Sequence, residues 1–311
     1  MSEEKKIKRI NTVQIVGTLV ETGNLKFDEK KENEKTKLKG AINRVDLSKP
    51  AFVIDVNGQK IGVSPLPTYK QKKEDGKIVD NKQFQALEKV MGYEVGTRVM
   101  VKGSISVSAP YKSKGNGNVI EPVSIQMFSM SSTGVPEEDY AEGKVSGYIK
   151  KIKDETNNED EETGRLIVDF WLYDDYNKLV SPFPLIVEED VANDFNDAFD
   201  NGNTAILDFD IVSRKIGRKE PDGGFGNRKS KVTGGYNVME YSIFNGNSVD
   251  DESEYYIDED VFKNLFKAHE QRKEEAKNAS SNNESKSNKG LGSARTSHVE
   301  DVDDDENPFD D

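Results

Sequence analysis

The chain has 311 residues, a net charge of −14 and no cysteine. That length suits about two domains with tails, at roughly 100–200 residues each. Without cysteine neither disulfides nor thiolate metal sites can form, and a reducing compartment such as the cytoplasm is the expected location. The apolar runs are only a few residues long, so we expect no membrane span and no signal peptide.

Charge is distributed unevenly along the sequence. Residues 1–134 carry more Lys and Arg than Asp and Glu, whereas residues 135–249 and 250–311 are both acidic. The overall negative charge argues against a nucleic-acid partner, but the basic first part is compatible with one.

The first unit is predicted over residues 11–132, after an N-terminal arm of residues 1–10. Its first strand, 11–21, alternates apolar and polar residues, and Gly17 marks a bend in it. Residues 22–50 are predicted to be a long lysine-rich loop. The remaining elements are two hairpin strands at 51–56 and 59–64 that turn at Asn57-Gly58, a lysine-rich connection, a helix near 81–91, a strand after Gly96 and a strand near 120–130.

A second unit, predicted over residues 140–249 after a linker at 133–139, repeats that order. The motif Val-Ser-Pro-Leu-Pro at 63–67 returns as Val-Ser-Pro-Phe-Pro at 180–184, one domain length further on. Equivalent elements surround each copy, which indicates a duplication. The second set comprises strands near 142–152, 164–174 and 177–187, a helix near 189–200, and strands near 203–213 and 235–245.

Five strands with one helix between the third and fourth resemble the oligonucleotide/oligosaccharide-binding (OB) fold. The resemblance implies a Greek-key barrel that presents its second and third strands and its 1–2 and 4–5 loops to a ligand. We therefore expect a mostly β chain of two tandem OB-like five-stranded barrels, followed by a C-terminal helix and a disordered acidic tail. Two small β-sandwich modules of another topology are the alternative.

Basic and aromatic side chains at the ligand positions of this fold favour single-stranded nucleic acid, because cations follow phosphates and rings stack on bases. In the first unit the candidates are Lys70, Lys72, Lys73, Arg98, Lys102, Tyr111, Lys112 and Lys114. In the second unit, strand alternation turns Tyr148, Trp171 and Tyr173 outward. The alternative is that these rings cap the barrel or are buried against the other unit.

The 4–5 loop of the second unit is a glycine-rich segment with many cations and one aromatic residue. Its candidates are Arg214, Lys215, Arg218, Lys219, Phe225, Arg228, Lys229 and Lys231. Such a concentration inside an acidic unit favours phosphate binding over a merely solvated surface. Asp208 and Asp210 point outward on the preceding strand and should repel phosphate, so we expect the first unit and this loop to supply most of the attraction.

The chain ends with an acidic segment and helix at 250–278 and a disordered linker with an acidic tip at 279–311. Val261, Phe262, Leu265 and Phe266 fall at helical spacing, which predicts a helix that packs on a barrel. Residues 279–298 are rich in Asn, Ser and Lys, which is typical of disorder.

The tip resembles that of bacterial and phage single-stranded DNA-binding proteins, in which aspartates precede a Pro-Phe pair that recruits replication and repair enzymes. By this resemblance Phe309, next to Pro308, would fill an apolar pocket on a partner, and three aspartates would meet its basic rim; these are Asp303, Asp304 and Asp305. The tip departs from the family pattern by Glu306-Asn307 before the proline and by Asp310-Asp311 after the phenylalanine. A partner that reads a terminal phenylalanine carboxylate could not read this one.

These features together predict a non-enzymatic protein that binds single-stranded DNA during replication, recombination or repair. We expect no cofactor, protein partners bound through the tail, and a cytoplasmic location, which is the host cytoplasm if the gene is carried by a phage. Single-stranded RNA is the alternative ligand. From other classes, the alternatives are a metal-dependent nuclease using Asp169, Asp208 and Asp210, and a protein-interaction scaffold.

Overall fold

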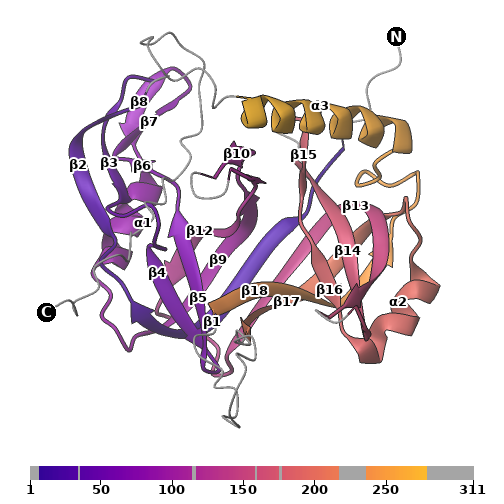
Figure 1. The fold of residues 1–311 in the computed structure, drawn as a ribbon. Coiled ribbons are helices and arrows are strands. Elements are labelled where there is room, and N and C mark those ends of the chain that lie inside the picture. The colour runs from indigo at the N-terminus through magenta and orange to yellow at the C-terminus, as the bar shows by residue number, and fades with distance from the viewer. Residues whose placement is uncertain are drawn as a thin grey trace, which may run out of the picture.

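The computed structural model describes residues 7–33, 36–113, 117–157, 160–174, 177–216 and 236–278. Within these ranges the chain is mostly strand (Figure 1). The strands of two barrels join into one continuous sheet, and the described residues also form three smaller sheets of two or three strands and three α-helices. None of the helices in the described part of the chain has the length and apolar content that spanning a bilayer requires.

Five strands form the first barrel: β1 (Asn11–Glu21), β4 (Phe52–Val56), β5 (Gln59–Pro65), β9 (Arg98–Val107) and β12 (Val123–Ser131). β1 pairs with β4, β4 with β5, β5 in parallel with β12, β12 with β9, and β9 again with β1. This ring closes the barrel in the strand order of an OB fold. Helix α1 (Lys82–Met91) lies between β5 and β9 in the chain and buries Phe84, Leu87 and Val90.

The second barrel repeats this ring with a divided third strand. Its strands are β13 (Tyr140–Thr156), β14 (Glu162–Asp174), β15 (Leu179–Pro182), β16 (Leu185–Val187), β17 (Thr204–Ile216) and β18 (Tyr236–Ser248). β14 pairs with β15 and β16, β16 runs parallel to β18, and β17 pairs back to β13. A short 3-10 turn, η1 (Glu189–Val191), and helix α2 (Ala192–Ala198) occupy the place of α1.

The predicted fold class is confirmed by these pairings: the chain is mostly β, with two OB-like five-stranded barrels and a C-terminal helix. The alternating strands also bury the expected side chains. Ile15 and Leu19 in β1, and Val168 and Phe170 in β14, have no exposed surface. The predicted disordered tail, residues 279–311, lies outside the described residues.

The two barrels are joined through their first strands. Residues Asn11–Val16 of β1 pair antiparallel with Val145–Tyr140 of β13, and each strand then turns to its own barrel. A glycine stands at each change of partner, Gly17 in β1 and Gly147 in β13. A Cβ there would lie 2.2 Å from a backbone oxygen, of Asp55 for Gly17 and of Trp171 for Gly147, so no larger residue fits.

Residues 22–50 were predicted to be a loop, and this is wrong. They form β2 (Leu25–Glu32) and β3 (Lys39–Arg44), which pair with each other and, through β3, with β6 (Thr68–Tyr69). Leu25 and Ile42 are buried among the exposed lysines and supply the apolar contact that orders the segment. The lysine-rich connection that follows forms a hairpin of β7 (Gln71–Glu74) and β8 (Lys77–Asp80).

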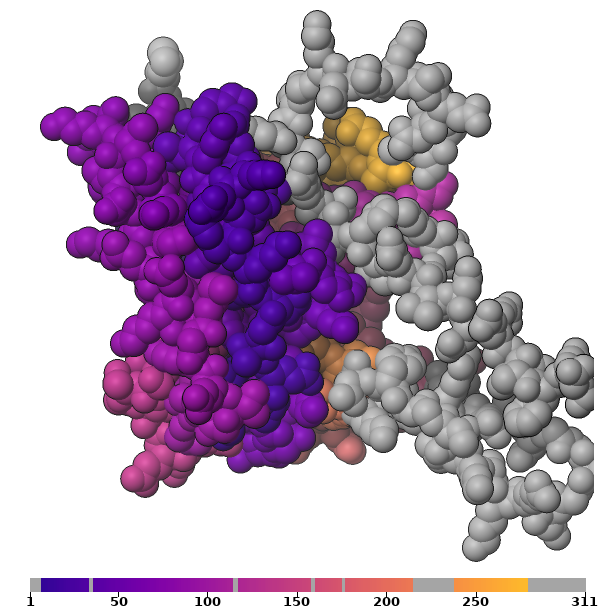
Figure 2. Space-filling view, turned by 90° about the vertical axis from the view of Figure 1, so that its left-hand side faces the viewer, coloured from indigo at the N-terminus to yellow at the C-terminus, as the bar shows by residue number. Residues whose placement is uncertain are grey.

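We call β2, β3, β6, β7 and β8 together the wing of the first barrel. It rises at the upper left of Figure 1. Figure 2 looks at the molecule from this side, where residues of the first barrel form most of the coloured surface. The wing therefore places the lysines of β2, β3, β7 and β8 on one side of the first barrel.

Helix α3 (Glu259–Asn278) begins at Asp258, whose carboxylate accepts hydrogen bonds from the backbone of Asp260 and Val261. It lies across the top of the second barrel in Figure 1 and contacts β15. Its far end reaches β10 (Tyr111–Lys112) and β11 (Val119–Ile120), the small hairpin in the 4–5 loop of the first barrel. The predicted packing of this helix on a barrel is confirmed.

Candidate nucleic-acid interface

Trp171 and Tyr148 were expected to face outward on the second barrel, but α3 covers both rings. Each is only 4% exposed. The ring of Phe262 stacks on Tyr148 with centroids 3.9 Å apart and planes inclined by 15°. Phe266 meets Trp171 edge to face at 5.0 Å. The expectation that these two rings are exposed is wrong, and helix side chains occupy the stacking positions that a base would need.

The polar groups around the covered rings are also used inside the molecule. The Trp171 indole N–H donates to the carboxylate of Asp169 at 2.8 Å. Lys150 places its ammonium 3.9 Å from the centroid of the Phe266 ring. Burial raises the pKa of the Tyr148 phenol, and the nearby Glu259 carboxylate adds to the shift. Tyr173 is half-buried and packs against the same cluster.

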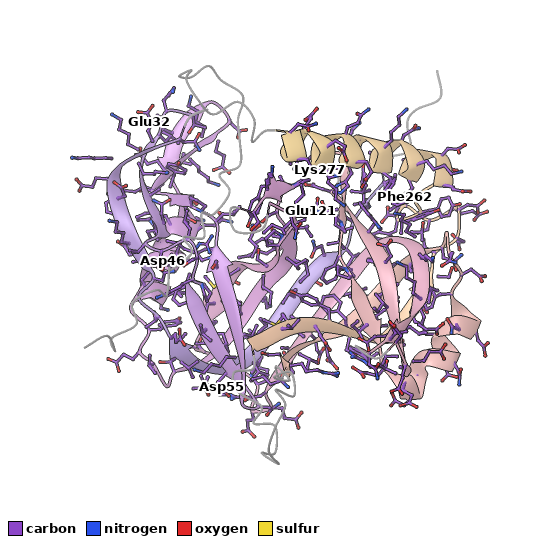
Figure 3. The ribbon with its side chains drawn as sticks, in the orientation of Figure 1. Glu32, Asp46, Asp55, Glu121, Phe262 and Lys277 are labelled. Atoms are coloured by element: carbon purple, nitrogen blue, oxygen red, sulfur yellow. The ribbon has the colours of Figure 1, made fainter. Side chains whose placement is uncertain are left out.

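The other end of α3 ties this cluster to the first barrel. His269 is 1% exposed, and its Nε2 lies 3.2 Å from a carboxylate oxygen of Glu121, which follows β11. Its ring also meets Trp171 edge to face at 4.9 Å. Figure 3 shows Phe262 and Glu121 toward opposite ends of the helix. Helix α3 therefore covers the outer face of strands 1–3 of the second barrel and contacts both barrels.

Arg98 and Arg214, two of the candidate phosphate contacts, are engaged with other parts of the chain. Arg98 donates to the carbonyl oxygen of Pro136 at 2.8 Å and forms an ion pair with Asp139, so it holds the segment that joins the barrels. Arg214 pairs with Glu188 and Glu240 at 3.4 and 3.3 Å. Phosphate would have to compete with these carboxylates.

Most candidate lysines of the first barrel remain available. Four of them are exposed and form no ion pair with any described residue: Lys70, Lys73, Lys102 and Lys112. Lys72 lies 3.2 Å from Glu74 on the same strand, an exposed pair that contributes little. Tyr111 is half-buried in β10. These side chains stay predictions as phosphate contacts, and the wing gathers Lys70, Lys72 and Lys73 in one place.

Several candidates fall outside the described residues. In the two 4–5 loops these are Lys114, Arg218, Lys219, Phe225, Arg228, Lys229 and Lys231, and in the tail Asp303, Asp304, Asp305, Pro308 and Phe309. Lys215 lies in β17, with its side chain outside the description.

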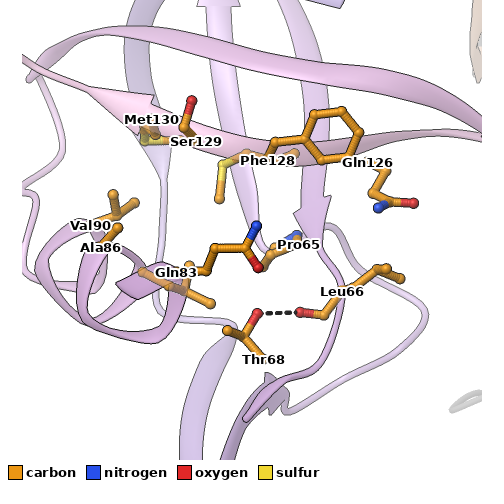
Figure 4. Close-up of a pocket in the computed structure, with 12 residues that line it drawn as sticks. Pro65, Leu66, Thr68, Gln83, Ala86, Val90, Gln126, Phe128, Ser129 and Met130 are labelled. Atoms are coloured by element: carbon orange, nitrogen blue, oxygen red, sulfur yellow. Dashed lines mark hydrogen bonds between the residues drawn. The ribbon is translucent and has the colours of Figure 1, made fainter. Parts of the chain in front are cut away.

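A hollow of about 220 Å³ opens beside the wing, between β5, α1 and β12 (Figure 4). Leu66 and Phe128 stand at it with more than half of their surface exposed. Thr68 of β6 lines it and donates a hydrogen bond to the Leu66 carbonyl. The exposed Lys70 follows two residues after Thr68 in the chain.

Phe128 and Phe244 are two exposed aromatic residues that strand alternation did not identify. They are 55% and 51% exposed on the fifth strands of the two barrels. A signal for them is present in the sequence, because Met127-Phe128 and Ile243-Phe244 are apolar pairs in otherwise alternating strands. Their separation nearly equals that of the two Val-Ser-Pro motifs, which marks them as equivalent positions.

The three aspartates of the nuclease alternative have separate surroundings. Asp169 binds the indole of Trp171, Asp208 pairs with Lys144 at 3.1 Å, and Asp210 is exposed on β17. Within the described ranges no three His, Cys, Asp or Glu side chains are grouped so that they could hold a metal ion. The described residues therefore do not form the metal site that the nuclease alternative requires.

Solved structures that the comparison finds similar to this chain include the wild-type single-stranded DNA-binding protein from Thermus aquaticus and a deletion mutant of it. The wild-type protein is 8% identical with a TM-score of 0.41, and the comparison covers 78% of this chain and 94% of that one. The mutant is 9% identical with a TM-score of 0.42, and covers 78% and 96%. No curated protein matches the sequence.

A family model describes almost all of the residues discussed above. It is the model of the YorF family, and it matches residues 9–282. This range includes the wing, both barrels and the whole of α3. The chain therefore belongs to the YorF family.

Proposed function

We propose that this protein binds single-stranded DNA without catalysing a reaction, and that the first barrel and its wing make the principal contact. The observation that carries the proposal is that the exposed Phe128 lines the same hollow as Thr68 of the wing, and that Thr68 is followed in the chain by the exposed Lys70. Cations that follow a phosphate backbone next to an aromatic platform are the usual means of binding single strands without reading sequence.

The second barrel contributes differently in this proposal. Its usual ligand face on strands 1–3 is closed by α3, so base stacking on Trp171 or Tyr148 requires the helix to move away. While α3 covers the second barrel, we therefore place the binding surface on the first barrel and at the junction of the barrels.

The biological role that we propose is the protection of single strands in replication, recombination or repair, in the cytoplasm of a cell or of a phage-infected host. The acidic tip, with Asp303, Asp304 and Asp305 before Pro308-Phe309, would recruit the enzymes that act on the strand. The resemblance of this tip to that of single-stranded DNA-binding proteins supports the assignment.

The test is a binding titration of labelled single-stranded DNA, single-stranded RNA and duplex DNA at two salt concentrations. Preferential binding of single-stranded DNA, weakening as salt rises, is expected, with a log–log slope of about −0.7 for each phosphate neutralised. A triple variant of the wing, with Lys70, Lys72 and Lys73 changed to alanine, should make the slope shallower.

A matched control removes the same charge from α3 by changing Lys263, Lys267 and Lys277 to alanine. Its slope should equal that of the unaltered protein. Tighter binding of RNA would select the alternative ligand, and magnesium-dependent cleavage of the oligonucleotide would select a nuclease. If the protein binds none of the polynucleotides, the proposal is refuted, and a protein-interaction scaffold is the alternative that remains.

A further inference from the structure

Phe128 and Phe244 occupy the same irregularity in the two barrels. In the first barrel, Met127 pairs with Gly103 and Ser129 with Lys102, so Phe128 is the extra residue of a β-bulge. In the second barrel, Ile243 pairs with Phe209 and Asn245 with Asp208, so Phe244 is the extra residue. A bulge re-aims a side chain that regular alternation would place otherwise, and bulges are common beside binding sites.

Both phenylalanine rings line one hollow of about 380 Å³ at the junction of the barrels. Its walls come from the fourth and fifth strands of each barrel, and the ladder between β1 and β13 runs along it. The two phenylalanines are 55% and 51% exposed, although the interior of either barrel would bury a ring. An exposed ring retained at equivalent positions in both halves of a duplicated chain indicates a ligand that the two halves share.

The side chains between the rings suit a nucleobase better than a purely apolar partner. Lys102 lines the hollow, and no carboxylate in the described ranges pairs with it. Gln14 of β1 lies in the same hollow and hydrogen-bonds to Tyr140 at 2.7 Å through its amide nitrogen, which leaves its oxygen as an acceptor. Gln126, two residues before Phe128, lines the adjoining hollow. Amides beside an aromatic face can bind the polar edges of a stacked base.

We propose that Phe128 and Phe244 are two stacking platforms for unpaired bases of a single strand that crosses the junction of the barrels. This inference rests on the proposed function and adds the position of the strand. It assigns the bases to the first, fourth and fifth strands, whereas OB folds generally use the second and third. It also gives the second barrel a role while α3 covers Trp171.

The two platforms should not contribute equally, because their electrostatic surroundings differ. Phe128 precedes Ser129, which pairs with Lys102, and it also lines the hollow that contains Thr68 of the wing. Phe244 lies on the side of Asp208, Asp210 and Glu142, and among the described residues only Asp208 of these three has an ion pair, with Lys144 at 3.1 Å. Phosphates will therefore approach Phe128 more closely, and loss of Phe128 should weaken binding more than loss of Phe244.

The experiment measures the affinity of the full chain for a labelled thymidine oligonucleotide of roughly 35 nucleotides, long enough for two OB sites. Phe128→Ala should weaken binding about 5-fold to 100-fold, Phe244→Ala less, and the double variant most. Phe128→Tyr, which keeps the ring, should retain affinity, whereas Phe128→Leu should not. Val95→Ala, at a residue 60% exposed in the turn before β9, is the control and should bind like the unaltered protein.

A direct readout is the variant Phe128→Trp, whose added fluorescence should be quenched by the oligonucleotide. If the unaltered protein binds DNA and the double alanine variant binds equally well, the stacking inference is refuted while the proposed function stands. If the unaltered protein does not bind at all, both fail. Loss of self-association in the double variant, with DNA affinity unchanged, would instead assign the two rings to contact with a second copy of the chain.

Discussion

Replacing Phe262 with alanine should release α3 from the second barrel without unfolding the barrels. Phe262 is the most deeply buried apolar residue of the helix and contacts both covered rings, with centroids 3.9 Å from Tyr148 and 6.1 Å from Trp171. The barrel core lies on the inner side of the strands and does not include this ring. The energetic loss should therefore fall on docking of the helix.

Its size follows from the burial. A buried Phe→Ala change costs about 3–5 kcal/mol. Since about 1.4 kcal/mol corresponds to a tenfold change in an equilibrium constant, even the lower value shifts the ratio of released to docked helix by roughly 100-fold. The contacts of Phe266 and His269 remain, so the released state becomes populated while the helix is not lost altogether.

Trp171 reports the change because it is the only tryptophan. In the unaltered protein, its emission should be that of a buried indole and should respond little to single-stranded DNA. In Phe262→Ala, the emission should shift to the red, acrylamide should quench it more strongly, and oligonucleotide should quench it too. Val261→Ala changes a residue of the same helix that is 40% exposed, and should leave all three readouts as they are.

Two outcomes would contradict this account. An unchanged emission in Phe262→Ala would show that the helix contributes little to covering Trp171. Strong quenching by oligonucleotide in the unaltered protein would show that the helix leaves readily when DNA binds, so that the second barrel uses its strands 1–3 after all.

Three further changes have outcomes that the structure specifies. Arg165→Ala should cost about 3 kcal/mol of unfolding free energy, measured by thermal or urea melts, because this guanidinium is 11% exposed and its removal takes a cation from Glu155, Glu188 and Glu240, of which the last two keep Arg214. Burial raises the pKa of Tyr241 above the ordinary 10.0, so above pH 10 the folded protein keeps a proton that the unfolded chain loses. The free energy of unfolding should therefore fall by about 1.4 kcal/mol per pH unit above pH 10. Urea melts across that range should show a shallower fall for Tyr241→Phe. Removing residues 299–311 should raise affinity for single-stranded DNA at low salt, with a gain that shrinks as salt rises, because the acidic tip competes with phosphate for lysines; equal affinities at low ionic strength would exclude that competition.

The barrels could be predicted from the sequence because their strands carry regular alternation and occur twice. Ile15, Leu19, Val168 and Phe170 follow the two-residue period, and the glycine and proline positions mark the strand ends. Strands β2 and β3 could not be found in this way. Their apolar residues are few, and they are ordered by contact with a helix that begins about forty residues later.

The site was harder to predict, because most of the errors depend on long-range contacts. Alternation correctly placed Trp171 outside the barrel, but it contains no information on α3, which returns from about ninety residues further along the chain. Similarly, nothing local to Arg98 indicates that the Pro136 carbonyl will bind it. Phe128 was missed for the opposite reason, since a bulge breaks the period on which the prediction relied.

The ladder between β1 and β13 has a consequence for any attempt to produce one barrel alone. Each barrel supplies the neighbour that the first strand of the other would otherwise lack, and cutting the chain at the linker would leave Asn11–Val16 with an open edge. Because this ladder is antiparallel and joins equivalent strands, a second copy of the first barrel could take the vacant place in the same orientation. A half-length fragment should thus form a homodimer, in which the two copies are arranged as the two barrels are in the intact chain.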